Sequence, residues 1–361
     1  EEERAVFHDL GVFSGPVTGE IAAVVLDRAD ILETMCDLVD RSLLVADTDG
    51  DRTLYRSLRT VRRHSQQRLQ DQGRWSPLRR RHLDAMVDLA GELDVALRSE
   101  EEPHADAALD AIVAELRAAH AWARDDDPGA AIALSARLHV YGVSRTRDEI
   151  QRWAEHLSDL VLPGPDGAVT LATVGFRANN QGRFDLAIEA ATRSLELAGT
   201  DTAARFAHEV LGDAALYNGD LDGGHRHGAA VAGLGEAAED QRAIALGRGG
   251  MALSRAYAGR FEEALKIIDA TDTRAMSPSG RAWMAYCLGE VLGDRNPGDA
   301  LDAVSSAVSA ADAAGERFLA GVARISWSSL LGRHGPIDKA LGSFADIIDY
   351  WLVRRNRTHL V

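Results

Sequence analysis

The chain has 361 residues and a formal net charge of −16, from 56 acidic and 40 basic side chains. This length predicts two or three domains, and the negative charge disfavours general binding of nucleic acid or anionic membranes. The sequence contains no apolar run of about 18 residues that would predict a membrane span. Its acidic start, Glu1-Glu2-Glu3, lacks the basic and then apolar beginning of a signal peptide. We therefore expect a cytoplasmic protein.

Residues 1–75 predict a small domain that contains both helices and strands. Apolar residues repeat at helical spacing in three stretches, around 6–13, 21–26 and 31–39. Two short apolar runs then flank the acidic segment Asp47–Asp51, which contains an Asp-Gly pair, and they predict a β-hairpin. Another helix is expected to begin near Leu58. Three helices followed by a hairpin is the order of a winged helix.

The second half of the chain contains an internal repeat. Gly182-Arg-Phe-Asp-Leu-Ala187-Ile recurs as Gly259-Arg-Phe-Glu-Glu-Ala264-Leu and as Gly335-Pro-Ile-Asp-Lys-Ala340-Leu. Gly219 lies 37 residues after Gly182 and 40 residues before Gly259. Each unit predicts two helices joined by a tight turn at the glycine, with a small residue where the helices cross. A period slightly above 34 is typical of tetratricopeptide-like helical hairpins.

These patterns predict a mainly all-α protein with one β-hairpin. We expect a winged-helix domain at 1–75, a helical connector with a degenerate first repeat at 76–165, and tetratricopeptide-like repeats forming an α-solenoid at 166–361. The segment Pro163-Gly-Pro-Asp-Gly167 is the predicted linker before the repeats. The glycine-rich segment Gly247-Arg-Gly-Gly250 lies inside a repeat and predicts close helix packing rather than a phosphate loop.

Enzymatic motifs are absent from the sequence. It contains no Gly-x-x-x-x-Gly-Lys-Ser/Thr loop, no His-Glu-x-x-His pair and no nucleophile elbow. His225 and His227 would point in different directions on a helix, and no third metal ligand is evident. We therefore expect no enzymatic activity and assign no catalytic, cofactor-binding or metal-binding residue.

Basic residues gather at the end of the predicted winged helix, where ten arginines between 52 and 82 accompany a single acid, Asp71. One interpretation is a surface that faces phosphates, of DNA or of a nucleotide in a neighbouring domain. Its residues would be Arg56, Arg59, Arg62 and Arg63. The favoured interpretation is that this basic region pairs with the acidic helices that follow it. Acidic residues on the helix at 31–41, which would enter a DNA groove, also disfavour direct binding.

Solenoids bind through the concave face that the first helix of each repeat lines. Placing the turns at the repeated glycines predicts a polar and aromatic groove, suited to a peptide or a small effector, formed by Asn179, Asn180, Glu209, Asp213, Tyr217 and Tyr257. Three of these, Asn180, Tyr217 and Tyr257, each precede a turn glycine by two residues and should occupy equivalent positions. The alternative is that these side chains merely solvate an inner surface.

Several segments resemble one bacterial family. Arg4-Ala-Val-Phe-His-Asp-Leu-Gly-Val-Phe-Ser-Gly15 and the segments 38–45 and 55–62 resemble the winged-helix region of signal-transducing NTPase (STAND-type) transcriptional regulators of the AfsR and LuxR type. The segments 79–82, 109–122, 182–185 and 351–356 resemble the helical region that follows in that family. The resemblance therefore covers nearly the whole chain and suggests an actinobacterial source.

The resemblance implies that an ATPase domain, with its ATP or ADP, precedes this chain in the complete regulator and is missing here. It implies a switch in which an effector or a protein partner binds the repeats and the winged helix relays this to the ATPase and an output domain. Two other functions stay open. One is a regulator that binds DNA directly through the basic winged helix, and the other is a non-catalytic scaffold for protein interaction.

Overall fold

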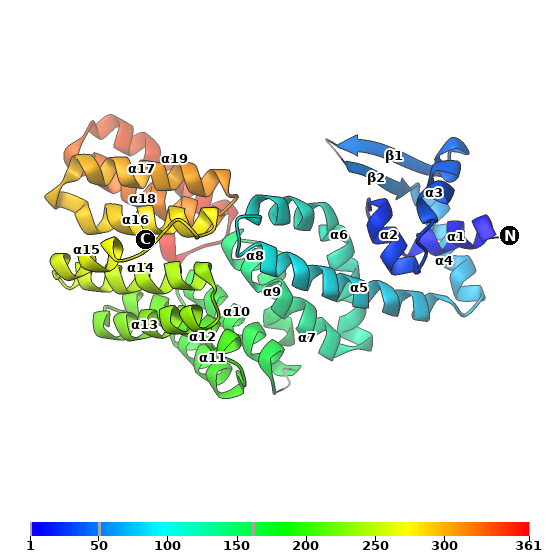
Figure 1. Ribbon diagram of the computed structural model, residues 1–361, viewed down its shortest axis with the longest axis horizontal. Coiled ribbons are helices and arrows are strands. Elements are labelled where there is room, and N and C mark those ends of the chain that lie inside the picture. The colour runs from blue at the N-terminus through cyan, green and yellow to red at the C-terminus, as the bar shows by residue number, and fades with distance from the viewer. Residues whose placement is uncertain (1, 50–51, 161–162, 361) are drawn as a thin grey trace. The chain divides into compact units, whose positions relative to one another are not determined.

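The computed structural model describes residues 2–49, 52–160 and 163–360 (Figure 1). The chain forms two compact units, one of residues 1–93 and 107–134 and the other of residues 94–106 and 135–361. Nearly all described elements are helices, and one antiparallel pair of strands is the only sheet within the described ranges. The predicted mainly all-α fold with one β-hairpin is confirmed.

The first unit begins with the predicted winged helix and continues into longer helices. Its elements are α1 (Glu2–Asp9), η1 (Leu10–Val12), α2 (Gly19–Leu26), α3 (Ile31–Asp40), β1 (Leu44–Asp49), β2 (Arg52–Ser57) and α4 (Arg59–Asp71). The helices α5 (Trp75–Ala96), α6 (Glu102–Asp126) and α7 (Pro128–Arg137) follow, and each has residues in both units.

The β-hairpin pairs from Leu44 opposite Ser57 to Asp49 opposite Arg52. An additional bridge joins Val17 to Tyr55 and fixes the segment before α2 against the hairpin. The strands are longer than predicted, because residues 47–49 of the expected turn pair with β2. Residues 50–51 of that turn lie outside the described ranges.

The second unit contains the helical repeats. Two helices precede them, α8 (His139–Ser144) and α9 (Asp148–Leu157), followed by the short η2 (Ser158–Leu160). The repeats comprise α10 (Pro165–Asn180), α11 (Phe184–Leu197), α12 (Asp201–Tyr217), α13 (Leu221–Ala237), α14 (Gln241–Tyr257), α15 (Phe261–Asp269), α16 (Pro278–Leu292), η3 (Gly293–Arg295), α17 (Pro297–Ala313), α18 (Arg317–His334) and α19 (Ile337–Val353). A final single turn, η4 (Thr358–Leu360), ends the described chain.

The turns between paired helices form where the repeat predicts them. Gly182, Gly219 and Gly259 have φ values of 72°, 77° and 76°, a left-handed conformation that glycine adopts without the cost that a side chain imposes. Gly335, in the third copy of the motif, is instead extended, with φ of −133°. The turn before α19 therefore depends on Pro336 rather than on a left-handed glycine.

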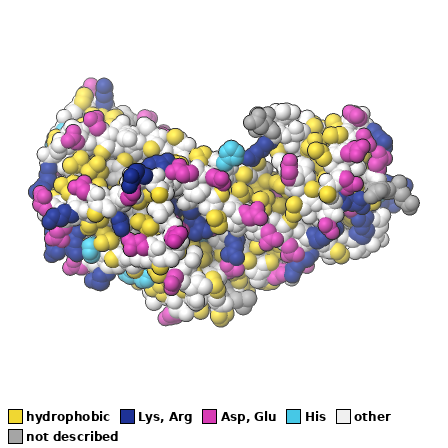
Figure 2. Space-filling model, viewed as in Figure 1, with side chains coloured by type: hydrophobic (Ala, Val, Ile, Leu, Met, Phe, Trp, Pro, Cys, Tyr) yellow, Lys and Arg dark blue, Asp and Glu magenta, His cyan; other side chains and the backbone are white. Residues whose placement is uncertain are grey.

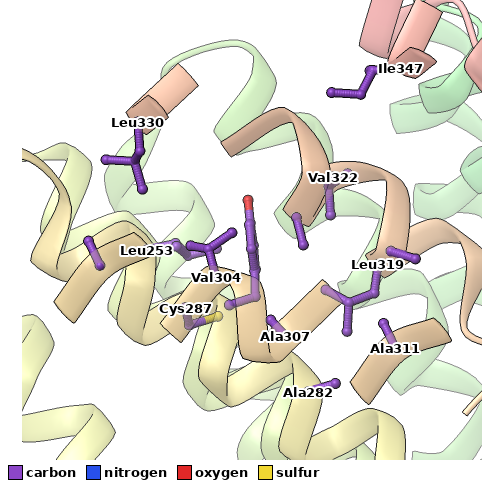
Figure 3. Packing of buried hydrophobic residues seen from close by; sticks show 14 of the residues in the cluster. Leu253, Ala282, Cys287, Val304, Ala307, Ala311, Leu319, Val322, Leu330 and Ile347 are labelled. Atoms are coloured by element: carbon purple, nitrogen blue, oxygen red, sulfur yellow. The ribbon is translucent and has the colours of Figure 1, made fainter. Parts of the chain in front are cut away.

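Small side chains lie where the paired helices cross, and the core is built around them. Ala187, Ala264 and Ala340 are buried at the predicted crossing positions. Figure 3 shows the largest C-terminal cluster, in which Cys287 of α16, Val304 of α17 and Leu319 of α18 pack together. Alanine and glycine at helix crossings allow the backbones to approach closely, which suits a chain with few aromatic residues.

The two compact units and the predicted domains divide the chain in different ways. The segment 163–167 is not a linker between the compact units, because α10 begins at Pro165 and both flanking helices belong to the second unit. The compact units also do not follow the predicted ranges 1–75, 76–165 and 166–361, since residues 94–106 pack with the repeats. That three-domain division stays a prediction. None of the described helices is long and apolar enough to cross a membrane.

Candidate functional site

The repeats enclose a cavity of about 100 Å³. Polar, charged and aromatic side chains from α10, α12, α14, α16 and α18 line it, among them Phe176, His208, Glu209, Asp213, Arg242, Trp283, Glu316 and Phe318. Five glycines, Gly212, Gly224, Gly228, Gly247 and Gly250, complete the walls where α12, α13 and α14 approach each other. Because Phe176 and Phe318 also pack against each other, with ring centroids 5.4 Å apart, the first and last hairpins of the array meet beside this cavity.

Two carboxylates of α12 face the cavity one helical turn apart. Glu209 lies 3.7 Å from the Nε of Arg205 through its Oε1. Asp213 makes no ion pair and no hydrogen bond with any described residue. Burial, together with the neighbouring Glu209, raises the pKa of Asp213 from 3.8 to about 7. The cavity therefore contains a carboxyl group that the protein itself does not neutralise.

A third carboxylate and one guanidinium complete the charged wall. Glu316 caps the N-terminus of α18, where its Oε2 accepts a hydrogen bond of 2.6 Å from the backbone of Leu319. Burial raises the pKa of Glu316 to about 7. The Nη2 of Arg242 lies 4.0 Å from Glu316 Oε1, and its side chain is only 10% exposed. Arg242 donates no hydrogen bond to the part of the chain that the structure describes, although buried guanidinium groups normally have acceptors.

An ion-pair network behind the cavity holds α12 and α14 in place. The Nη1 of Arg205 donates to Asp240 Oδ2 at 2.8 Å, and the Nη1 of Arg98 donates to the same oxygen at 3.1 Å. Arg98 also pairs with Asp94 at 2.7 Å. Asp240 in turn caps α14 by accepting from the backbone of Ala243. The end of α5 is thereby joined to the helices that carry Glu209, Asp213 and Arg242.

Two of the predicted groove residues bind the chain's own C-terminal tail. The side chain of Asn180 accepts a hydrogen bond of 3.0 Å from Asn356, and its backbone carbonyl accepts one of 2.8 Å from the N–H of Arg357. The backbone carbonyl of Asn179 accepts from the Thr358 hydroxyl. Asn179 and Asn180 are buried. They are therefore already occupied in this structure.

The aromatic side of the groove meets the same tail. The hydroxyl of Tyr217 lies 3.1 Å from His359 Nε2. The His359 ring also stacks on Trp351, at 4.8 Å between centroids, and meets Phe318 edge-on. Burial lowers the pKa of His359 to about 4, so the ring is neutral at neutral pH. Tyr217 thus contacts the tail and not the cavity.

The six predicted groove residues therefore divide into three groups. Glu209 and Asp213 line the cavity, and Asn179, Asn180 and Tyr217 hold the tail. The hydroxyl of Tyr257 donates to Glu290 at 2.7 Å and does not line the cavity. Asn180, Tyr217 and Tyr257 are the final residues of α10, α12 and α14, which are equivalent positions.

Sequence reasoning missed Arg242, Trp283 and Glu316. Counting back from the turn glycines reaches the C-terminal halves of the first helices, whereas Arg242 and Trp283 lie in the first halves of α14 and α16. Glu316 precedes α18 and is a helix cap. The pattern Gly-Glu-Arg at 315–317, a positive-φ glycine before an acidic residue at a helix start, is the signal that would have located it.

The four arginines predicted to face an anion lie in the first unit. Two of them have partners among the described residues and two do not. Arg56 pairs with Asp47 at 3.3 Å, and Arg62 donates to the backbone carbonyl of Ser14. Arg59 and Arg63 are exposed and have no hydrogen-bond or ion-pair partner in the described ranges. These two remain available to an anion.

Two arginines of α5 contact α6 or the residue that follows it. Arg80 pairs with Asp127, and Arg79 donates to the backbone carbonyl of Ala118 at 2.7 Å. On α3, Glu33 and Asp37 are exposed, and carboxylates on that surface would repel phosphates. Acidic and basic side chains are also scattered over the visible face of the repeats (Figure 2).

Of the two histidines considered as metal ligands, His227 contacts His208 of α12. His227 Nδ1 lies 2.9 Å from Nδ1 of His208, a hydrogen-bonding distance. No group of three potential ligands that could hold a metal ion occurs among the residues described.

The raised pKa of Asp213 predicts a pH-dependent stability. Between its ordinary pKa of 3.8 and its native value of about 7, the native state binds more protons than the unfolded state. Stability therefore falls as pH rises through this range, by up to about 1.4 kcal/mol per pH unit for one group. Because Asp213→Asn cannot ionise, this variant should gain stability relative to wild type between about pH 5 and about pH 8.

Urea unfolding at several pH values measures this effect. Asp302→Asn, on the exposed surface of α17, is the matched control for the loss of one negative charge. Equal pH profiles for wild type and Asp213→Asn would show that Asp213 is already ionised and solvated in the native state.

The relatives found by comparison with known proteins are named as transcriptional regulators. No protein-family model matches the chain. Proteins of Mycobacterium tuberculosis and Mycobacterium bovis, provisionally named HTH-type transcriptional regulators, are 34% identical over 131 residues. The match covers 35% of this chain and 15% of those proteins. The chain therefore matches only a small part of the length of these relatives.

A solved structure supports the architecture. The crystal structure of a Signal Transduction ATPase with Numerous Domains (STAND) protein with a tetratricopeptide repeat sensor, from Pyrococcus horikoshii, is similar with a TM-score of 0.57 at 16% identity. The similarity covers 100% of this chain and 52% of that one. The resemblance to STAND-type regulators that carry tetratricopeptide repeats, predicted from the sequence, is confirmed by these two comparisons together.

Proposed function

We propose that this chain is the regulatory and sensor portion of a bacterial signal-transducing transcriptional regulator. In this proposal an effector or a protein partner binds the helical repeats, and the winged helix relays the event to an NTPase domain in cis that holds ATP or ADP. The relatives named as transcriptional regulators and the similarity to a STAND protein with a tetratricopeptide repeat sensor support a regulatory role.

The observation that carries the sensor role is the cavity inside the repeats. It brings together Asp213, which has no partner among the described residues, and Arg242, which has no hydrogen bond to them. Buried polar groups of this kind cost free energy unless a ligand or water satisfies them. A cavity with such groups is therefore better suited to binding a ligand than to stabilising the fold.

The ion-pair network gives a physical route for the relay. Asp240, at the start of α14, is two residues from Arg242 and binds Arg98, which also binds Asp94. Asp94 belongs to the last turn of α5, and the earlier residues of this helix belong to the first unit. A ligand that moves Arg242 would thus act on the end of a helix that continues into the other unit.

The test uses the purified chain and a low-molecular-weight metabolite fraction from the source bacterium. We expect the fraction to raise the melting temperature and to change hydrogen exchange in α12 and α14, with a second change in α5. Asp302→Asn should respond as wild type does. Failure of both the fraction and whole-cell protein extract to change either measurement would rule out a sensor and favour a plain scaffold.

Direct DNA binding is the second candidate, and the exposed Arg59 and Arg63 favour it. It predicts a salt-sensitive gel shift with duplex DNA that is lost in the Arg59→Ala/Arg63→Ala variant. The regulatory proposal predicts no shift with the isolated chain. It also predicts no ATP hydrolysis, and turnover above background by the purified chain would contradict it.

A further inference from the structure

We propose that the cavity in the repeats binds a free amino acid, with its ammonium group at Asp213 and its carboxylate at Arg242. This inference rests on the proposed sensor function and specifies the chemistry of the effector. Three features of the cavity support it: two acidic side chains on α12, the guanidinium group of Arg242 and aromatic walls.

The acidic end is suited to an ammonium group. Asp213 and Glu209 lie four residues apart on α12 and both line the cavity. Within the described ranges, the one charged group that acts on Asp213 is Glu209, which is also an acid. Arg205 lies 3.7 Å from Glu209 and forms its shorter contact, of 2.8 Å, with Asp240. An ammonium group placed here would supply the positive charge and the donors that Asp213 lacks.

The guanidinium end is suited to a carboxylate. Arg242 is only 8% exposed, and its one ionic contact, to Glu316, is 4.0 Å long. Glu316 already accepts from the backbone of Leu319, so it is oriented by α18 and not by Arg242. All five N–H donors of Arg242 thus lack an acceptor among the described residues. A carboxylate can accept two of them in parallel, the geometry that a guanidinium favours.

The walls limit the size and character of the ligand. Trp283, Phe176 and Phe318 line the cavity with Leu216, Leu246 and Leu319. The indole Nε1 of Trp283 is buried and has no hydrogen-bond partner among the described residues, so it offers one further donor. A cavity of about 100 Å³ restricts the ligand to a small organic molecule and excludes a folded peptide, and a leucine-sized side chain requires the walls to adjust. The aromatic and aliphatic walls favour an apolar side chain, which selects leucine and phenylalanine as probes.

The binding experiment compares each amino acid with two analogues that lack one charged group. Isothermal titration of the purified chain would use leucine, isoamylamine and isocaproate, and then phenylalanine, phenethylamine and hydrocinnamate. We expect at least one of the two amino acids to bind, and the amine and the acid from the same series to bind roughly 10- to 100-fold more weakly, because each leaves one buried charged group unpaired.

Two variants assign the groups. In Asp213→Asn the amino acid should bind no better than its deaminated analogue, and in Arg242→Gln it should bind no better than the matching amine. Asp302→Asn should bind as wild type does. Circular dichroism and urea unfolding would test whether each variant is folded. Asp213→Asn is nearly isosteric with the wild-type side chain and removes a buried carboxylate.

The results separate the two proposals. If neither amino acid binds but the metabolite fraction stabilises the chain in an Asp213-dependent manner, the amino-acid assignment is wrong and the sensor function stands. If the fraction also has no effect, the small-molecule sensor role fails as well. Amino-acid binding that is unchanged in both variants, or an amine that binds as tightly as its amino acid, would also overturn the assignment.

Discussion

Replacing Arg145 by methionine is expected to lower the free energy of unfolding of the repeat-containing unit by about 3–5 kcal/mol. Arg145 is 1% exposed and lies at the end of α8, where it donates to Glu102, Asp106 and the backbone carbonyl of Ala314. Methionine keeps an unbranched apolar side chain, although a shorter one, and leaves the carboxylate of Glu102 buried without its counterion.

The effect of Arg145 should exceed that of other ion pairs in this unit. Glu102 also accepts from the backbone N–H of Ser279, so it links α6 to the start of α16 and cannot turn away to water. The double variant Arg145→Met/Glu102→Gln has no buried unpaired carboxylate. Its loss of unfolding free energy should therefore be smaller, by roughly 1–3 kcal/mol, than the sum of the losses in the two single variants.

Urea unfolding followed by tryptophan fluorescence and circular dichroism measures these differences. The control is Arg152→Met on α9, where the side chain is 44% exposed and pairs with Asp148 at 3.2 Å. Exposed pairs of this kind contribute about 0–1 kcal/mol. If Arg145→Met and Arg152→Met lower the free energy of unfolding by similar amounts, the buried ion pairs of Arg145 do not hold α6 and α8 together.

Replacing Gly247 by alanine is expected to destabilise the protein by about 1–3 kcal/mol, because the new methyl group would overlap the backbone of α13. A Cβ at Gly247 would meet backbone atoms of Ala232 and Gly228, and neither helix can move aside without losing contacts along its length. This glycine belongs to the segment that could be mistaken for a phosphate loop, and its role is close packing of α13 on α14.

Gly250, three residues later on the same helix, is the matched control for Gly247. A Cβ at Gly250 would meet no atom within 4 Å. Gly250→Ala should therefore stabilise the helix by up to about 1 kcal/mol, since alanine has the higher helix propensity. Thermal or urea unfolding should show that Gly247→Ala is less stable than wild type and that Gly250→Ala is more stable. Stability changes of the same sign in both variants would contradict the proposed packing role of Gly247.

Local features of the fold could be predicted from the sequence. The turn glycines Gly182, Gly219 and Gly259 recur at nearly regular spacing. Their positive φ angles favour glycine whatever the neighbouring residues are, because glycine has no Cβ. The β-hairpin was predictable because alternating apolar residues flank a turn sequence. In each case the structure depends on residues that are close together in the chain.

Contacts between distant residues could not be predicted in the same way. Asn180 binds Asn356, 176 residues away, and Arg145 binds the carbonyl of Ala314, 169 residues away. The exposed appearance of Asn179 and Asn180 in a repeat pattern gives no sign of a tail that returns to cover them. Arg242 also faces Glu316 only because α14 and α18 meet across the array, which depends on the curvature accumulated over several hairpins.

The return of the C-terminal tail to α10 changes how the repeats should unfold. In an open array each hairpin contacts only its neighbours, so the terminal helices fray first and the others remain folded. Here the segment after α19 is bound to Asn180, and Phe318 packs on Phe176. Loss of the last hairpin would therefore uncover part of α10, so the first and last hairpins are expected to unfold together.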